Sequence, residues 1–209
     1  MSTLKVAQEP MFLRGVEDNP KPSSYRDLIE NAKASGGDYW QIWHLLAFDP
    51  EAAHHLAALS HTLMHKPSPL GAGLRELIAA YTSSLNNCEF CMKAHAAVAA
   101  ELLGDEPLVW SVIRNLETSA LDEKDKSLLR FVHKVTLTPA SITAADTQSL
   151  NQAGWDDASI FYAISACALF NFYNRWISAS GVHPVSDEAF KRLALRMAVA
   201  GYARQSLDC

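Results

Sequence analysis

The sequence predicts an all-α protein, and three observations support this. Apolar residues recur with the helical period along nearly every segment after about residue 22, capping and breaking residues separate these segments, and runs with the strand period are scarce. Hydrophobic residues make up 49% and charged residues 20% of the 209-residue chain, which is typical of a globular protein with a sizeable core. We therefore expect helices packed around such a core, in one large domain or two small ones.

The expected helices follow an irregular N-terminal arm, residues 1–22, in which three prolines disfavour regular structure. In chain order the helices cover residues 23–34, 40–48, 50–65, 74–85, 88–103, about 106–116, 122–137, 143–152, 157–178 and 187–203. Pro50 suits the first turn of the third helix, and Gly104 suits the end of the fifth. The segment 157–178 is apolar nearly all round, which predicts a central buried helix.

Charge and composition exclude several classes of protein. The formal net charge is -5 and no block of Lys and Arg is present, so a nucleic-acid interface is not expected. The first residues lack the apolar core of a signal peptide, and no apolar run reaches the roughly 18 residues that span a bilayer. We expect a cytoplasmic protein without membrane contact. In that reducing compartment a close cysteine pair is more often catalytic or metal-binding than structural.

Such a pair is present in the segment Asn87-Cys88-Glu89-Phe90-Cys91-Met92-Lys93-Ala94-His95. Cys88 and Cys91 are three residues apart, and Cys91 and His95 are four apart, so all three share one helix face. The start of a helix favours thiolate over thiol, and His95 is one turn away for proton exchange. A pair at this spacing closes a disulfide with little backbone movement, as a two-electron cycle requires.

A carboxylate joins this group through the register of the two helices. Glu76 lies ten residues before Asn86, the centre of the expected turn, and His95 lies nine residues after it. In an antiparallel hairpin Glu76 and His95 therefore sit at the same height. A carboxylate opposite an imidazole orients the ring and holds its proton, which predicts a Glu–His–Cys relay.

The spacing of Glu76, Cys88, Cys91 and His95 resembles the signature of AhpD, an alkylhydroperoxidase of the carboxymuconolactone decarboxylase superfamily. The segments Arg75-Glu76-Leu77-Ile78-Ala79 and Asn171-Phe172-Tyr173-Asn174-Arg175 look most like its uncharacterised peroxidase-related branch. The resemblance covers about residues 20–205, so we expect an AhpD-like helical domain over residues 23–205.

The resemblance implies peroxide reduction through a disulfide cycle in a homo-oligomer, either a trimer or a hexamer. It makes Cys91 the peroxidatic cysteine, Cys88 the resolving cysteine that also exchanges with a dithiol or thioredoxin-like electron donor, and His95 and Glu76 the proton carriers. It implies neither a cofactor nor a metal. AhpD has a histidine immediately before its second cysteine, whereas this chain has Phe90, so the relay loses one polar member.

A shift of fifty positions reveals a weak internal repeat, which suggests two related halves over about 23–118 and 119–205. The shift aligns Ile78 with Leu128, Tyr81 with Phe131, Leu85 with Val135 and Gly104 with Gly154. It also places Lys126, Thr138, Ser141 and Ala145 at the positions of Glu76, Cys88, Cys91 and His95. The second half would therefore keep the helices and lack the reactive groups.

Other interpretations of the cysteine pair remain open at this point. A structural zinc site needs four ligands, usually from two separated pairs, whereas Cys167 and Cys209 each stand alone. Cys88, Cys91 and His95 with Glu76 still offer a possible metal set, and inert buried thiols are a further alternative. Within redox chemistry, the replacement by Phe90 favours a disulfide reductase as the alternative to a peroxidase. A non-catalytic, redox-sensing oligomer is the third hypothesis.

Overall fold

The computed structural model describes residues 9–202, and within this range it contains eleven α-helices, one 3-10 turn and no strand. The helices are α1 (Arg14–Glu17), α2 (Ser24–Ser35), α3 (Ile42–Phe48), α4 (Pro50–Met64), α5 (Ala72–Leu85), α6 (Glu89–Leu103), α7 (Glu106–Arg114), α8 (Glu123–Leu137), α9 (Ala144–Gln152), α10 (Asp157–Ser180) and α11 (Asp187–Ala200). The turn η1 covers Pro139–Ser141. The predicted all-α class is confirmed.

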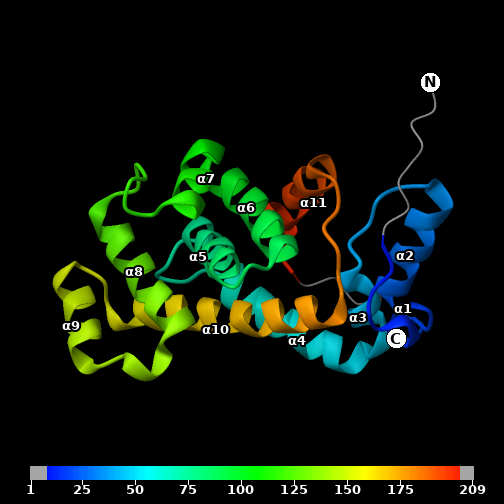
Figure 1. Ribbon diagram of the computed structural model, residues 1–209, viewed down its shortest axis with the longest axis horizontal. Helices are drawn as coiled ribbons and strands as arrows, with labels where there is room; N and C mark the ends of the chain where they lie inside the picture. The colour runs from blue at the N-terminus through cyan, green and yellow to red at the C-terminus, as the bar shows by residue number, and fades with distance from the viewer. Residues whose placement is uncertain (1–8, 203–209) are drawn as a thin grey trace.

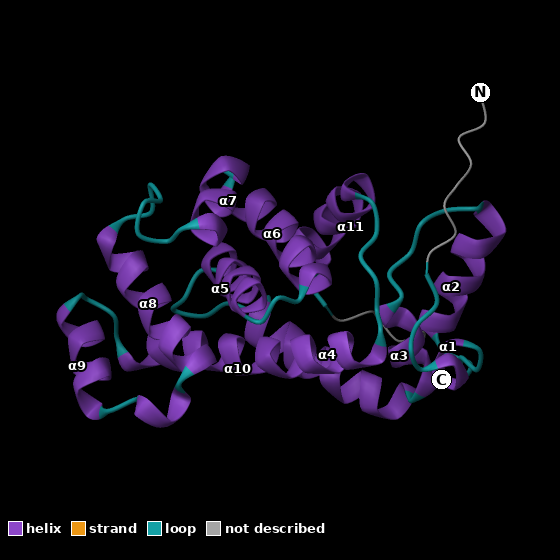
Figure 2. Cartoon of the chain, viewed as in Figure 1, coloured by secondary structure: helices purple, strands orange, loops and turns teal. Residues whose placement is uncertain are grey.

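The antiparallel hairpin of α5 and α6 forms the middle of the molecule (Figure 1). The long helix α10 crosses beneath it and packs against both α5 and α8, while α11 covers α6 from the other side. The N-terminal helices α1 to α4 lie toward the C-terminal end of α10, and loops join the helices throughout (Figure 2). None of the helices in the described range is long and apolar enough to cross a membrane.

Local sequence explains most helix boundaries. Ser23 accepts a hydrogen bond from the Arg26 N–H at 3.3 Å and caps α2, and Asp49 caps α4 directly before Pro50. Gly104 ends α6 in the left-handed conformation, with φ of 69°. Asn87, in the turn between α5 and α6, is also left-handed, with φ of 53°, a conformation that asparagine tolerates better than most residues.

The arm, expected to be irregular over 1–22, contains the short helix α1 and packs onto the body where it is described. The side chain of Met11 is buried, and the Phe12 N–H donates to the Ser180 carbonyl at 3.0 Å. Gln41 holds the arm from the other side, because its side-chain amide donates to the Glu9 carbonyl at 2.6 Å. The arm therefore closes over the end of α10, which residue composition alone did not indicate.

Helix α10 is central, as predicted, but it is not buried all round. Phe161 and Phe172 are exposed on the face that α5 and α8 leave uncovered. The apolar composition of this helix was interpreted as burial on every side, and that part of the expectation is wrong for the isolated chain.

Helix α11 ends three residues earlier than the expected 203, and Gly201 explains why. Gly201 has φ of 67°, and a side chain there would lie 2.6 Å from atoms of His61 in α4 and of His65, the residue that follows α4. The chain can turn closely against α4 only with glycine at this position. The turn directs the next residue, Tyr202, back toward α5 and α6.

Candidate functional site

The α5–α6 turn places both reactive cysteines at the start of α6. Cys88 is the N-cap residue, and its N–H donates to the Ser83 carbonyl at 2.9 Å. Cys91 lies in the first turn of the helix, and His95 lies one turn further on. The expected helix start is thus shifted by one residue, since α6 proper begins at Glu89.

Cys88 and Cys91 are both buried thiols that contact each other. They are 3% and 1% exposed, and neither forms a disulfide in this structure. The Cys91 side chain donates a hydrogen bond to the Cys88 sulfur, and the Cys91 N–H adds another. Against the opposing effect of burial, these bonds lower the pKa of Cys88 from 9.0 to about 6, with further help from Ser178 and Asn174. Burial raises the pKa of Cys91, so Cys88 is the thiolate of the resting pair.

Glu76 and His95 meet across the hairpin, as their register predicts. The His95 Nδ1 atom lies 2.7 Å from Glu76 Oε2, and both side chains are buried. The neighbouring Arg75 is buried too, but its side chain does not pair with Glu76. Its guanidinium donates instead to the carbonyls of Leu63 and Lys66, at 2.6 and 2.9 Å.

Tyr202 joins this pair and was not identified from the sequence. Its hydroxyl donates to Glu76 Oε1 at 2.7 Å and lies 3.2 Å from His95 Nδ1, and its ring stacks on that of His95. Burial, followed by the nearby Glu76 carboxylate, raises the pKa of Tyr202 well above its ordinary value, so its proton stays on. No local spacing points to it, because 107 residues separate it from His95.

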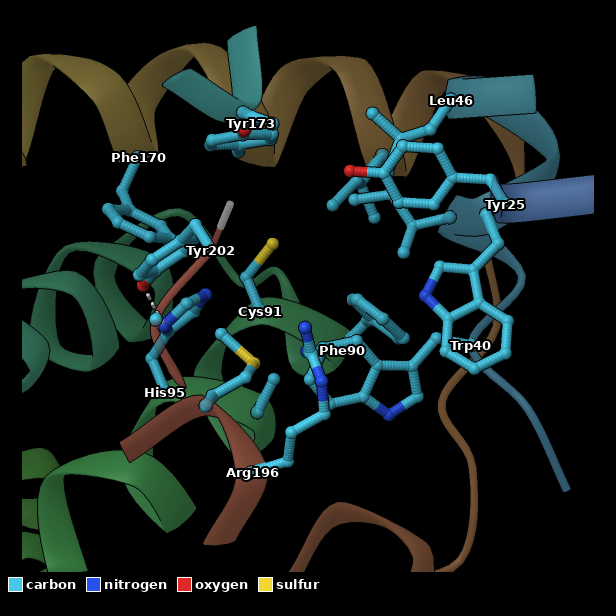
Figure 3. Close-up of a pocket in the computed structure, with 17 residues that line it drawn as sticks. Tyr25, Trp40, Leu46, Phe90, Cys91, His95, Phe170, Tyr173, Arg196 and Tyr202 are labelled. Carbon is cyan, nitrogen blue, oxygen red and sulfur yellow. Dashed lines mark hydrogen bonds between the residues drawn. The ribbon is translucent and has the colours of Figure 1, made fainter. Parts of the chain in front are cut away.

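The expected Glu–His–Cys relay therefore forms as two separate contacts, one between Glu76 and His95 and one between Cys91 and Cys88. Among the described residues no direct hydrogen bond is found between His95 and Cys91, although their spacing of one helical turn places the two side chains on one face. Figure 3 shows both on the same side of one pocket, with Tyr202 beside His95. Proton exchange between them needs a bridging group in that pocket.

A second polar group fastens the cysteine turn to α10. The Asn174 side-chain amide donates to Ser83 Oγ at 2.9 Å. The Asn86 amide donates to the side-chain oxygens of Asn174 and Asn171, at 2.9 and 3.0 Å. Asn171 and Asn174 belong to the segment Asn171–Arg175, the second of the two that resemble the peroxidase-related branch, and both contact the turn that carries the cysteines.

The pocket itself lies between α3, α6, α10 and α11 and has a volume of about 690 Å³, its open part included. Aromatic and aliphatic side chains form most of its wall, while Cys91, His95 and Tyr202 line one part of it (Figure 3). Phe90, which stands where AhpD has a histidine, packs edge-on against Trp40 with ring centroids 5.7 Å apart. From the sequence, Phe90 was interpreted only as the loss of a polar group. In the structure it forms part of the apolar wall of the pocket.

The side chains that the sequence offers as a metal set pair with one another. Within residues 9–202, no three His, Cys, Asp or Glu side chains are arranged to hold a metal ion together. His95 and Glu76 are directed at each other and at Tyr202, and the two thiols are directed at each other.

Comparisons with known proteins agree with this fold. Residues 50–106, which contain the whole Glu76 to His95 group, match the model of the carboxymuconolactone decarboxylase family. The structure is similar to that of an uncharacterised peroxidase-related protein from Silicibacter sp. TM1040, with a TM-score of 0.75, 29% identity, and 88% of this chain and 97% of that chain covered. Comparison with curated proteins gave no significant match.

Two more distant structures share the fold. The AhpD core of an uncharacterised peroxidase-related protein from Ralstonia eutropha JMP134 has a TM-score of 0.71, 24% identity, and 83% and 90% coverage of this chain and that one. A cysteine-to-alanine variant of the debrominase Bmp8, in complex with 2,3,4-tribromopyrrole, has a TM-score of 0.63, 18% identity, and 83% and 88% coverage. The family match over the cysteine hairpin and the likeness over most of the chain support a place for this protein in the AhpD-like carboxymuconolactone decarboxylase superfamily.

Proposed function

We propose that this protein is a thiol-dependent peroxidase that reduces hydroperoxides through a disulfide cycle between Cys91 and Cys88. The observation that carries the proposal is the placement of Cys91 in the pocket wall, hydrogen-bonded to a neighbouring thiolate. A second cysteine in contact is what turns a single oxidation into a reversible cycle.

The first chemical step consumes the peroxide. Cys91 transfers its proton to the Cys88 thiolate along the hydrogen bond they share, and the resulting Cys91 thiolate attacks the terminal oxygen of ROOH. The S–O bond forms as the O–O bond breaks, and the leaving alkoxide takes a proton to become ROH. Cys91 is thereby oxidised to a sulfenic acid, and the peroxide is reduced by two electrons.

The second step closes the disulfide. Cys88 gives up its proton again and attacks the Cys91 sulfur, so that the S–S bond forms and the S–O bond breaks, releasing water. An external dithiol then reduces the disulfide and completes the cycle. We propose a thioredoxin-like or small-molecule dithiol for this role.

Glu76, His95 and Tyr202 supply and accept the protons of these steps. The Glu76 carboxylate accepts hydrogen bonds only, so it fixes a proton on His95 Nδ1 and leaves Nε2 as the basic nitrogen of the ring. The Tyr202 hydroxyl occupies the other carboxylate oxygen and keeps Glu76 in place. His95 is then oriented to exchange a proton with a peroxide or alkoxide in the pocket.

The test is rapid-mixing measurement of peroxide consumption by the reduced protein. The parent should consume one equivalent per cysteine pair, Cys91→Ser should consume none, and Cys88→Ser should accumulate sulfenic acid detectable by mass spectrometry. Cys167→Ser is the matched control, because Cys167 is buried against Thr136 and lies outside the pocket. Consumption by Cys91→Ser at the parent rate would refute the assignment.

A disulfide reductase is the second candidate, favoured by the pKa of about 6 for Cys88. A thiolate stable at neutral pH also attacks a disulfide. Parallel rate measurements with hydroperoxides and with a small aromatic disulfide separate the two candidates. Peroxide turnover at micromolar concentration supports the peroxidase, and fast disulfide exchange without it supports the reductase.

We also propose that the protein forms a homo-oligomer, a trimer or a hexamer. Phe161, Ile164 and Phe172 are exposed along one side of α10, at positions that share a helix face. Large apolar side chains gathered in this way are typical of a contact with another protein surface. In this proposal the exposed face of α10 packs against a second copy of the chain.

A further inference from the structure

We propose that the substrate of the Cys91 pocket is an organic hydroperoxide with a bulky apolar body and one anionic group, and that Arg196 binds the anion. This inference rests on the proposed peroxidase function and names its substrate class. Its basis is that the wall of the pocket is mostly apolar, whereas Arg196 is the one permanently charged residue that lines it.

The pocket is much larger than hydrogen peroxide needs. Its volume is about 690 Å³ when the part open to solvent is included. Seventeen residues line it, and six of them are Trp, Tyr or Phe residues other than Tyr202: Tyr25, Trp40, Trp43, Phe90, Phe170 and Tyr173. Such a wall stabilises a rigid apolar body through the area that it removes from water.

Arg196 is the one permanently charged residue among those seventeen. It lies on α11 directly before Met197, another wall residue, and its side chain is half-buried. Figure 3 shows it extending from the helix toward the interior of the pocket. The cation is therefore presented to whatever fills the apolar space.

No carboxylate of residues 9–202 forms an ion pair with Arg196. Two other buried or paired arginines contrast with it: Arg130 pairs with Glu117 and Glu123, and Arg75 donates to two carbonyls. A guanidinium at an apolar, partly water-free wall interacts strongly with a planar anion and offers it two parallel hydrogen bonds. A carboxylate is the anion that best matches these properties.

The geometry also orients the substrate. Cys91, His95 and Tyr202 line the same pocket that Arg196 enters from α11 (Figure 3). A molecule anchored by its anion at Arg196, with its body against Phe90 and Trp40, brings its far end toward the thiol. Anchoring of this kind lowers the entropic cost of placing the O–O bond in line with the sulfur.

The experiment compares three peroxides of graded structure with the reduced full-length protein. The hydroperoxide of 4-isopropylbenzoic acid carries the body and the anion, its methyl ester carries the body alone, and hydrogen peroxide carries neither. We expect the acid to exceed the ester in kcat/KM by about 10- to 100-fold, the worth of a desolvated charge-assisted contact. Equal values for acid and ester in the parent would overturn the inference.

Variants of two arginines on the same helix assign the effect. Arg196→Met should raise KM for the acid and remove its preference over the ester, so that the two react with similar kcat/KM. Arg196→Lys should restore part of the preference, and Arg192→Met, outside the pocket, should retain all of it. If Arg196→Met slows all three peroxides equally, Arg196 acts on the thiol and the inference fails.

A binding measurement keeps this inference separate from the peroxidase proposal. Unreactive 4-isopropylbenzoate and its methyl ester are titrated against the protein while tryptophan fluorescence is followed, since Trp40 and Trp43 line the pocket. Tighter binding of the carboxylate, lost in Arg196→Met, supports the anion site even in a protein without peroxide turnover. Indifference to the charge refutes the anion site even in an active peroxidase.

Discussion

The Tyr202 hydroxyl donates a 2.7 Å hydrogen bond to Glu76 across 126 residues of sequence, and the two side chains with His95 form one buried group. Gly201 makes this contact possible, because it lets the chain turn closely against α4 before Tyr202. The end of α11 thus completes a site that begins on α5 and α6.

Removal of that hydroxyl should weaken the orientation of Glu76 and His95 without removing either. We expect Tyr202→Phe to lower kcat for peroxide reduction by about 3- to 30-fold and to change the pH dependence of kcat, since one hydrogen bond to the carboxylate is lost. Tyr162→Phe is the control, because Tyr162 lies outside the pocket. An unchanged pH profile in Tyr202→Phe would count against a positioning role for Tyr202.

The low pKa of Cys88 should depend on the hydrogen bond from Cys91. In a Cys209→Ser background, titration of the thiolate absorbance should place Cys88 near pH 6 in the parent. Cys91→Ser keeps a donor and should stay near that value, whereas Cys91→Ala removes the largest cause and should move the pKa upward toward 9.0. Identical titrations of the two variants would show that another group holds the thiolate.

The same shift makes the stability of the reduced protein depend on pH. Because folding lowers the pKa of Cys88, the unfolded chain binds more protons between about pH 6 and pH 9, and stability from this group rises with pH over that window. The contribution is complete above about pH 9 and lost below about pH 6. Urea unfolding of the parent and Cys88→Ser under reducing conditions should therefore diverge as the pH rises. Parallel curves would contradict the lowered pKa.

Assembly should depend on the exposed face of α10. The parent should run as a trimer or hexamer in size-exclusion chromatography with light scattering, and Phe161→Glu combined with Phe172→Glu should dissociate it, because a buried unpaired carboxylate is costly. Val199→Glu, at an exposed apolar residue of α11, serves as the control. A monomeric parent, or an assembly that tolerates both glutamates, would dismiss this face as the interface.

Local sequence was sufficient for most of the helices and for the contact of Glu76 with His95, but not for α1 or for the end of α11. Caps and periodicity depend on neighbours within one or two turns, so the ranges of α4 and α5 could be predicted to within two residues. The contact of Glu76 with His95 also followed, since two helices joined by a short turn keep equal distances from it at equal height. The division into two related halves remains a prediction.

What the sequence determined by itself was the all-α class, the hairpin, and the register that brings Glu76 to His95 beside Cys88 and Cys91. Only the tertiary structure decided that Tyr202 completes this group, that Asn174 braces the cysteine turn, and that Phe90 and Arg196 line one pocket. The physical reason is range: the first set depends on bonds and spacings along one hairpin, whereas the second depends on how α10 and α11 pack against it, which no local pattern records.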